Sequence, residues 1–92
     1  MEQISRDEFF NMNASHMVAV AADERDIYRL DEDTLGVIGI DRGDDIRVRG
    51  TVLRWSQGKY RNDGSNFESS RTEDGLERSR NKVEEWLQNQ TN

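Results

Sequence analysis

The chain of 92 residues contains no cysteine, which excludes disulfide bonds, thiolate metal sites and cysteine nucleophiles together. Long apolar runs are also missing, since no stretch approaches the ~18 apolar residues of a membrane-spanning helix. The first residues do not have the pattern of a secretory signal peptide. We therefore expect a cytoplasmic protein, in the host cytoplasm if a phage encodes it, and no membrane partner.

Residues with catalytic potential are few. The single histidine, His16, has no indicated partner that would orient it as a general base. Residues 31–33 are three carboxylates that begin like a calcium-binding loop, but the glycine and the closing glutamate of such a loop are missing. We predict a protein that is not an enzyme and uses no cofactor or metal ion. A small enzyme without a visible site is a weaker alternative.

Charge is distributed unevenly along the chain. The formal net charge is −6, with 19 acidic and 13 basic residues. Residues 42–61 nevertheless carry six cations and two acids, whereas residues 1–41 carry ten acids and three cations. Such segregation bears on partners rather than on fold. The preference for arginine over lysine suits binding to carboxylates and phosphates, although genomic base composition is an equal alternative.

Two helices are predicted, one at each end of a single small domain that spans residues 1–92 with frayed termini. Ser5 and Glu8 have the spacing of a capping box, and Ile4 before them is placed to pack on Phe9. They indicate a helix from about residue 6 to residue 13. Near the C-terminus an apolar stripe of helical period, preceded by the N-cap residue Thr72, predicts a helix over residues 73–89; its members are Leu76, Val83, Trp86 and Leu87.

Strands are predicted between these helices. A strand at 26–30 ends in the polar turn 31–33, and residues 35–40, apolar on both faces, indicate a central strand covered on both sides. Residues 46–49 alternate between apolar and basic side chains, and a β-bulge at Gly50 would turn Leu53 and Trp55 inward. After a tight turn at 56–58 a short return strand begins, and residues 62–71 are expected to form a mobile loop. Residues 17–22 fit a helix or a strand.

The predicted fold class is therefore α+β, a small antiparallel β-meander of three to four strands flanked by an N-terminal and a C-terminal helix. Both helices are expected on one face of the sheet, with Trp55 and Trp86 in one shared core. This order of elements resembles the double-stranded RNA-binding domain in topology. The basic helix-start motif of that family is absent from the sequence, so the resemblance implies a fold and no function.

The basic strand is the predicted partner-binding site. Arg47 and Arg49 would project from one face ~7 Å apart, which suits successive phosphates or acidic side chains. The remaining predicted contacts extend this patch, with the tyrosine ring available to stack on a base; they are Arg54, Lys59, Tyr60 and Arg61. The alternative is a solvated strand face neutralised by acids of the same chain. Imitation of DNA by the acidic N-terminal part ranks lower.

These features favour a small acidic binding protein. Our preferred interpretation is a phage or mobile-element inhibitor, anti-CRISPR-like, that docks through the basic strand on a host protein or nucleoprotein complex. The strand would meet either RNA or another phosphate backbone, or an acidic protein surface. The alternative is a housekeeping accessory subunit or an antitoxin that binds one protein partner through its C-terminal amphipathic helix. A nucleic-acid-binding module is a weaker alternative.

Overall fold

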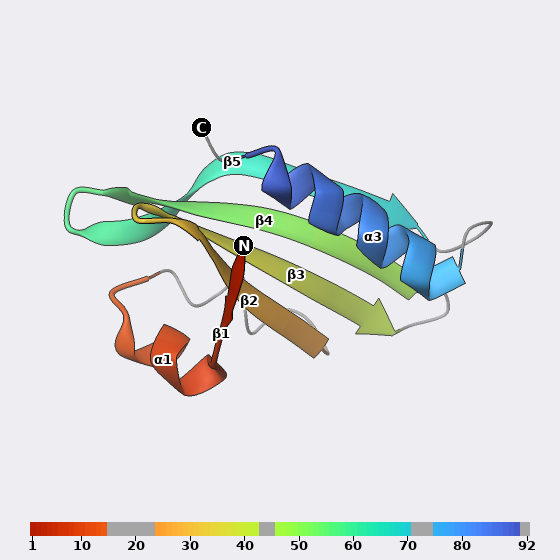
Figure 1. Ribbon diagram of the computed structural model, residues 1–92, viewed down its shortest axis with the longest axis horizontal. Helices are drawn as coiled ribbons and strands as arrows, with labels where there is room; N and C mark the ends of the chain where they lie inside the picture. Colours follow the sequence, from red (N-terminus) through yellow and green to blue (C-terminus); the bar gives the residue numbers. More distant parts are fainter. Residues whose placement is uncertain (15–23, 43–45, 71–74, 91–92) are drawn as a thin grey trace.

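The computed structural model describes residues 1–14, 24–42, 46–70 and 75–90. Five strands form one antiparallel sheet in chain order, with a short N-terminal and a longer C-terminal helix (Figure 1). This is the predicted α+β class. The elements are β1 (Glu2–Ile4), α1 (Arg6–Asn11), β2 (Glu24–Asp31), β3 (Thr34–Arg42), β4 (Ile46–Ser56), β5 (Lys59–Ser70) and α3 (Gly75–Gln88).

The sheet has more strands than predicted, five rather than three to four. The segment 62–71 was expected to be a loop, yet its residues up to Ser70 belong to β5, which pairs with β4. Between the pairs Leu53–Asn62 and Thr51–Asn66, one residue of β4 faces three of β5, so the strand bulges there, and Gly64 adopts a φ of 90°. The prediction failed because backbone pairing sustains this polar strand without an apolar pattern.

The N-terminus is also better anchored than predicted. Residues 2–4, expected to fray, pair with β2 as strand β1, and Ile4 is buried. The predicted N-cap is confirmed, because the Ser5 hydroxyl accepts a hydrogen bond from the Glu8 amide at 3.0 Å. Phe9 is fully buried in the same cluster as Ile4. Residues 17–22 and Thr72 lie outside the described residues.

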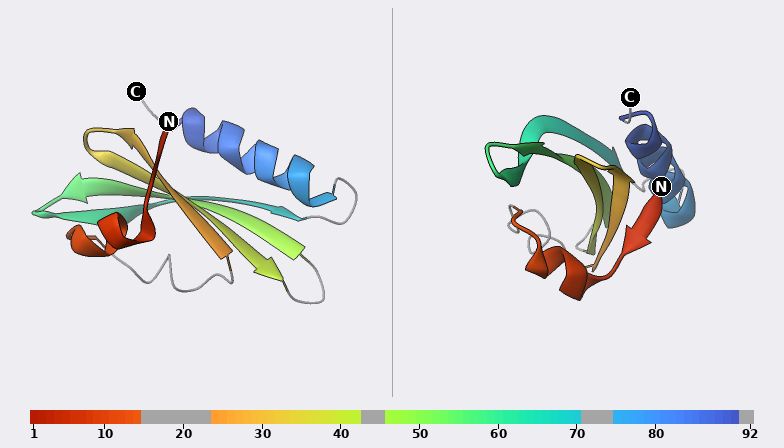
Figure 2. Two further views of the ribbon diagram at one scale, coloured as in Figure 1. Left: turned by 60° about the horizontal axis from the view of Figure 1, so that its bottom comes forward. Right: turned by 60° about the vertical axis from the view of Figure 1, so that its left-hand side comes forward.

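Both faces of the sheet are covered, each by a different helix (Figure 2, right). This corrects the prediction that both helices lie on one face. On the α3 side, Val83 and Leu87 pack on Ile38, Val48 and Val52. On the α1 side, a second cluster joins strand residues to the N-terminal segment; its members are Ile4, Phe9, Ala14, Ile27, Leu35, Val37, Leu53 and Tyr60. The predicted burial of residues 35–40 on both sides is confirmed.

The register of β4 follows from this double burial. Its pairing with β3 runs without a shift from Arg42–Ile46 to Thr34–Arg54, so the predicted bulge at Gly50 is wrong. No bulge is needed, because Val52 packs under α3 while Leu53 packs on the opposite face. Trp55, two residues beyond Leu53, therefore lies on the side of the sheet away from α3.

Helix α3 approaches the sheet closely where two strands carry glycine. A Cβ atom on Gly50 would lie 2.8 Å from Val83, and one on Gly36 would lie 3.0 Å from Leu87. The helix is also tied to β2 by Arg80, which donates to the Asp26 carboxylate at 2.8 Å and to the Tyr28 hydroxyl at 2.6 Å. The bond to Asp26 raises the pKa of the Arg80 guanidinium despite its partial burial, so this link stays charged.

Among the described residues, no helix is long and apolar enough to cross a membrane.

Candidate functional site

The structure divides the predicted basic patch between the two faces of the sheet. Arg47 and Arg49 lie on the α1 side of β4, near its beginning. Arg54, near the other end of the strand, lies on the α3 side and is the pairing partner of Arg61. Arg47 and Arg54 are seven positions apart, which corresponds to ~23 Å of extended chain. The predicted residues therefore do not form one continuous surface.

The two arginines of the predicted patch that lie on the α1 side are paired with acids of neighbouring strands. Arg49 lies 2.8 Å from the Asp41 carboxylate, and Arg47 lies 3.6 Å from that of Glu68. Arg42, at the end of β3, makes a two-pronged contact with Glu24. These contacts fit the alternative interpretation of a strand face neutralised by acids of the same chain.

The remaining predicted contacts also have structural roles. Tyr60 is 8% exposed and belongs to the α1-side core, so its ring is not available to stack on a base as predicted. The Arg54 guanidinium donates to the Gln90 carbonyl oxygen at 3.1 Å, and Arg61 donates to the Ser56 carbonyl oxygen at 3.2 Å. Lys59 lies partly exposed at the start of β5.

Trp55 does not lie in the core where its sequence position predicts it. It is 47% exposed instead of buried beside Trp86, which lies on the other face and stacks on Phe67. The Trp55 ring packs edge-on against Tyr60, with 5.0 Å between the ring centroids. Side chains alternate between the two faces along the whole of β4. Trp55 is three residues after Val52, so it lies on the opposite face of the sheet, away from α3.

The turn between β2 and β3 is fastened to the hairpin that carries Trp55. The Trp55 amide donates to the carbonyl oxygen of Asp33 at 2.8 Å, and the Tyr60 hydroxyl donates to that of Glu32 at 3.1 Å. Within the turn, the Asp31 side chain accepts from the Asp33 amide at 2.9 Å. Two hydrogen bonds and the ring contact with Tyr60 thus hold Trp55 beside the acidic turn, and a third hydrogen bond fixes the turn itself.

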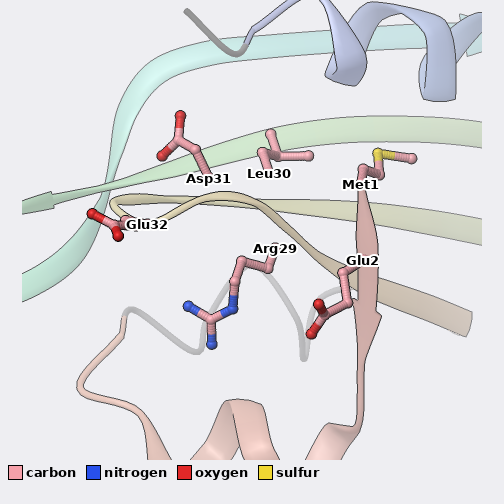
Figure 3. A pocket seen from close by; sticks show the side chains of 6 residues that line it. All are labelled: Met1, Glu2, Arg29, Leu30, Asp31 and Glu32. Atoms are coloured by element: carbon pink, nitrogen blue, oxygen red, sulfur yellow. The ribbon is translucent and has the colours of Figure 1, made fainter.

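An open depression lies between this turn and the tryptophan. We call it the Trp55 surface; it is lined by Asp31, Glu32, Asp33, Thr34, Arg54 and Trp55. A second open depression, shown in Figure 3, shares Asp31 and Glu32 with the first and is also lined by Met1, Glu2, Arg29 and Leu30. There Met1 is 44% exposed, and Arg29 points toward α1, where it lies 3.7 Å from Glu8. The carboxylates of the turn are exposed.

The chain matches no protein-family model, and neither a curated protein nor a solved structure matches it. The Trp55 surface presents an exposed indole, three carboxylates and a hydrogen-bonded guanidinium. In the part of the chain that the structure describes, no three acidic or histidine side chains are grouped so that they could hold a metal ion. His16 lies outside the described residues.

Proposed function

We propose that this protein is a non-catalytic binding module that docks on another protein through the Trp55 surface. The single observation that carries the proposal is the 47% exposure of Trp55 in a depression next to fixed backbone. Tryptophan is among the residues most enriched at the energetic centres of protein interfaces. An exposed tryptophan that no core requires is therefore the best contact point on the described surface.

The surroundings of Trp55 support docking because they are rigid before any partner arrives. The indole packs on Tyr60, and both residues are hydrogen-bonded to the same turn. Side chains and loops that are already ordered lose little conformational freedom on binding, which leaves more of the contact energy as affinity. A partner would meet a preformed anchor and rim.

A phage or mobile-element inhibitor of a host protein or nucleoprotein complex is the biological role that we propose for such a module. Its small size and acidity favour that role. Docking through the basic strand stays a prediction with less support, because Arg47 and Arg49 are paired with Glu68 and Asp41.

The alternative role, an accessory subunit or antitoxin that inserts its C-terminal helix into a partner, has less support from packing. The apolar stripe of α3 already covers this protein's own sheet, with Val83 and Leu87 completely buried. What α3 turns outward is mainly polar, including Glu77, Asn81 and Glu85.

The proposal is tested by affinity capture from the native host with three versions of the chain: wild type, Trp55→Ala and Phe10→Ala. Phe10 is the matched control, because it is also an exposed aromatic residue, 36% accessible, and lies on α1. We expect the wild type and Phe10→Ala to recover the same protein, with or without nuclease, and Trp55→Ala to lose it. Equal recovery by Trp55→Ala would overturn docking through this surface.

A further inference from the structure

We propose that the segment bound at the Trp55 surface is basic, with an arginine or lysine side chain that lies over the Trp55 ring and faces the carboxylates of residues 31–33. This inference rests on the proposed docking function and specifies the chemistry of the partner. It combines three properties of one place in the fold: an accessible indole, an acidic rim without ion pairs, and the orientation of the nearest arginine.

The acidic rim differs from six other carboxylates of the described chain, each of which lies within ion-pair distance of an arginine. Five arginines of the sheet and α3 lie within ion-pair distance of an acid of the same chain; they are Arg29, Arg42, Arg47, Arg49 and Arg80. In the described part of the chain, Asp31, Glu32 and Asp33 make no ion pair, although all three are exposed. Within the described residues, no ion pair therefore neutralises the negative charge of this rim.

Arg54 lines the same depression, and its contacts direct its guanidinium toward α3. One of its nitrogens donates to the Gln90 carbonyl oxygen at 3.1 Å, and the other donates to the Thr34 hydroxyl at 3.4 Å. These contacts hold its charge on the face of the sheet opposite the side on which Trp55 lies. An incoming cation at the indole would thus meet the carboxylates before the arginine.

A basic segment fits this combination better than the other occupants. A cation within ~6 Å of an indole face is attracted by the ring, and tryptophan is the best of the aromatic side chains for this contact. A nucleobase would also stack on the indole, but its phosphates would then lie near three carboxylates. A second copy of this chain, which carries a net charge of −6, would bring further negative charge to the rim.

The test uses a short peptide of alternating arginine and glycine as the probe, and the same peptide with glutamate in place of arginine as its control. Binding is followed by NMR of the isotope-labelled full chain, through the indole N–H of Trp55 and the amides of residues 31–34. We expect the arginine peptide to shift these signals and the glutamate peptide to leave them unchanged. The affinity should fall as salt is added, because exposed charges are screened.

Two double variants with equal net charge separate the rim from general acidity. Glu32→Gln with Asp33→Asn removes two rim charges and keeps Asp31, whose side chain holds the turn. Glu77→Gln with Glu85→Gln removes two exposed charges from α3. We expect the rim variant and Trp55→Ala each to weaken peptide binding about fivefold and the α3 variant to bind like the wild type.

Several results would overturn the inference. They are equal binding of the peptide to all variants, peptide-induced shifts confined to other parts of the chain, and no binding to the wild type. In the host capture experiment, loss of the partner with Trp55→Ala but not with the rim variant would leave docking intact and overturn a basic partner. Retention of the partner by Trp55→Ala would instead overturn the proposed function itself.

Discussion

The hydroxyl group of Tyr60 donates a hydrogen bond to the backbone carbonyl oxygen of Glu32, 3.1 Å away. This bond joins the β4–β5 hairpin to the β2–β3 turn. Tyr60 is buried and supports the Trp55 ring, while Glu32 belongs to the acidic rim. One side chain therefore positions both parts of the Trp55 surface.

Replacing Tyr60 by phenylalanine should loosen the acidic turn without removing the ring on which Trp55 packs. The lost hydrogen bond should lower the free energy of unfolding by about 1 kcal/mol, as measured in urea. Amide exchange at Asp33 and Thr34 should accelerate more than exchange in α3. Unchanged exchange in the turn would show that the Trp55–Asp33 backbone bond holds it alone.

The two tryptophans should respond in opposite ways to truncation. Trp86 packs against the α3-side core and stacks on Phe67, so Trp86→Ala should cost about 3 kcal/mol or more. Trp55→Ala removes an exposed ring and one ring contact, so it should cost only about 1 kcal/mol. Thermal melts of both variants check this contrast. A small loss with Trp86→Ala would contradict its place in the core.

Much of the framework could be predicted from local signals. Short sequence patterns predict four of the observed features: the cap at Ser5, the turn at residues 31–33, the doubly buried strand and the C-terminal helix. The Ser56–Gly58 turn is likewise where the sequence indicates it, between β4 and β5. These patterns need no knowledge of distant parts of the chain.

The errors concern properties that depend on distant residues. β5 is polar because it lies at the edge of the sheet, so its pairing with β4 leaves little trace in its side chains. Which face each helix covers is likewise invisible in a strand such as β3, whose two sides are equally apolar. The assumption of a single core led to the bulge at Gly50 and to the burial of Trp55. The ion pairs of Arg47 with Glu68 and of Arg49 with Asp41 could not be predicted, because they depend on the register of β3, β4 and β5.

Adding a methyl group at Gly50 should push α3 away from the sheet. The new Cβ would lie 2.8 Å from Val83 and about as close to the Trp86 ring, at 3.0 Å. We expect Gly50→Ala to destabilise the fold by about 1–3 kcal/mol. Val83→Ala removes the nearest methyl group. In a double-mutant cycle, the stability lost by the double variant should therefore be smaller than the sum of the losses of the two single variants. Additive losses would contradict a steric contact at this position.

The turn between β4 and β5 should be easy to stabilise. Gln57 has a φ of 53°, and Gly58 follows with a φ of 80°. Left-handed conformations are unfavourable for most side chains but are tolerated by asparagine, which also suits this type of hairpin turn. Gln57→Asn should raise the free energy of unfolding by about 0.5–1 kcal/mol, and Gly58→Ala should lower it. Denaturant melts of the two variants, compared with wild type, test both directions.

Neutralising the paired arginines should leave docking unchanged. Arg47→Gln with Arg49→Gln removes two exposed ion pairs, so the cost in stability should be no more than about 1 kcal/mol. Reversal to glutamate would be less informative, because it would place two further acids beside Asp41 and Glu68. Host capture by this variant should match the wild type, with circular dichroism as the folding control. Loss of the partner would instead show that docking takes place through the basic strand.

The glycines under α3 have a consequence for how β3 and β4 find their alignment. A slip of one residue exchanges the two faces of a strand. In β3 that exchange would replace one apolar set, Leu35 and Val37, by another, Ile38 and Ile40, so hydrophobicity alone discriminates poorly between the two alignments. Gly36 distinguishes them, because a slipped β3 would present Val37 to Leu87 in its place. Fidelity of strand alignment thus depends on where the chain has no side chain.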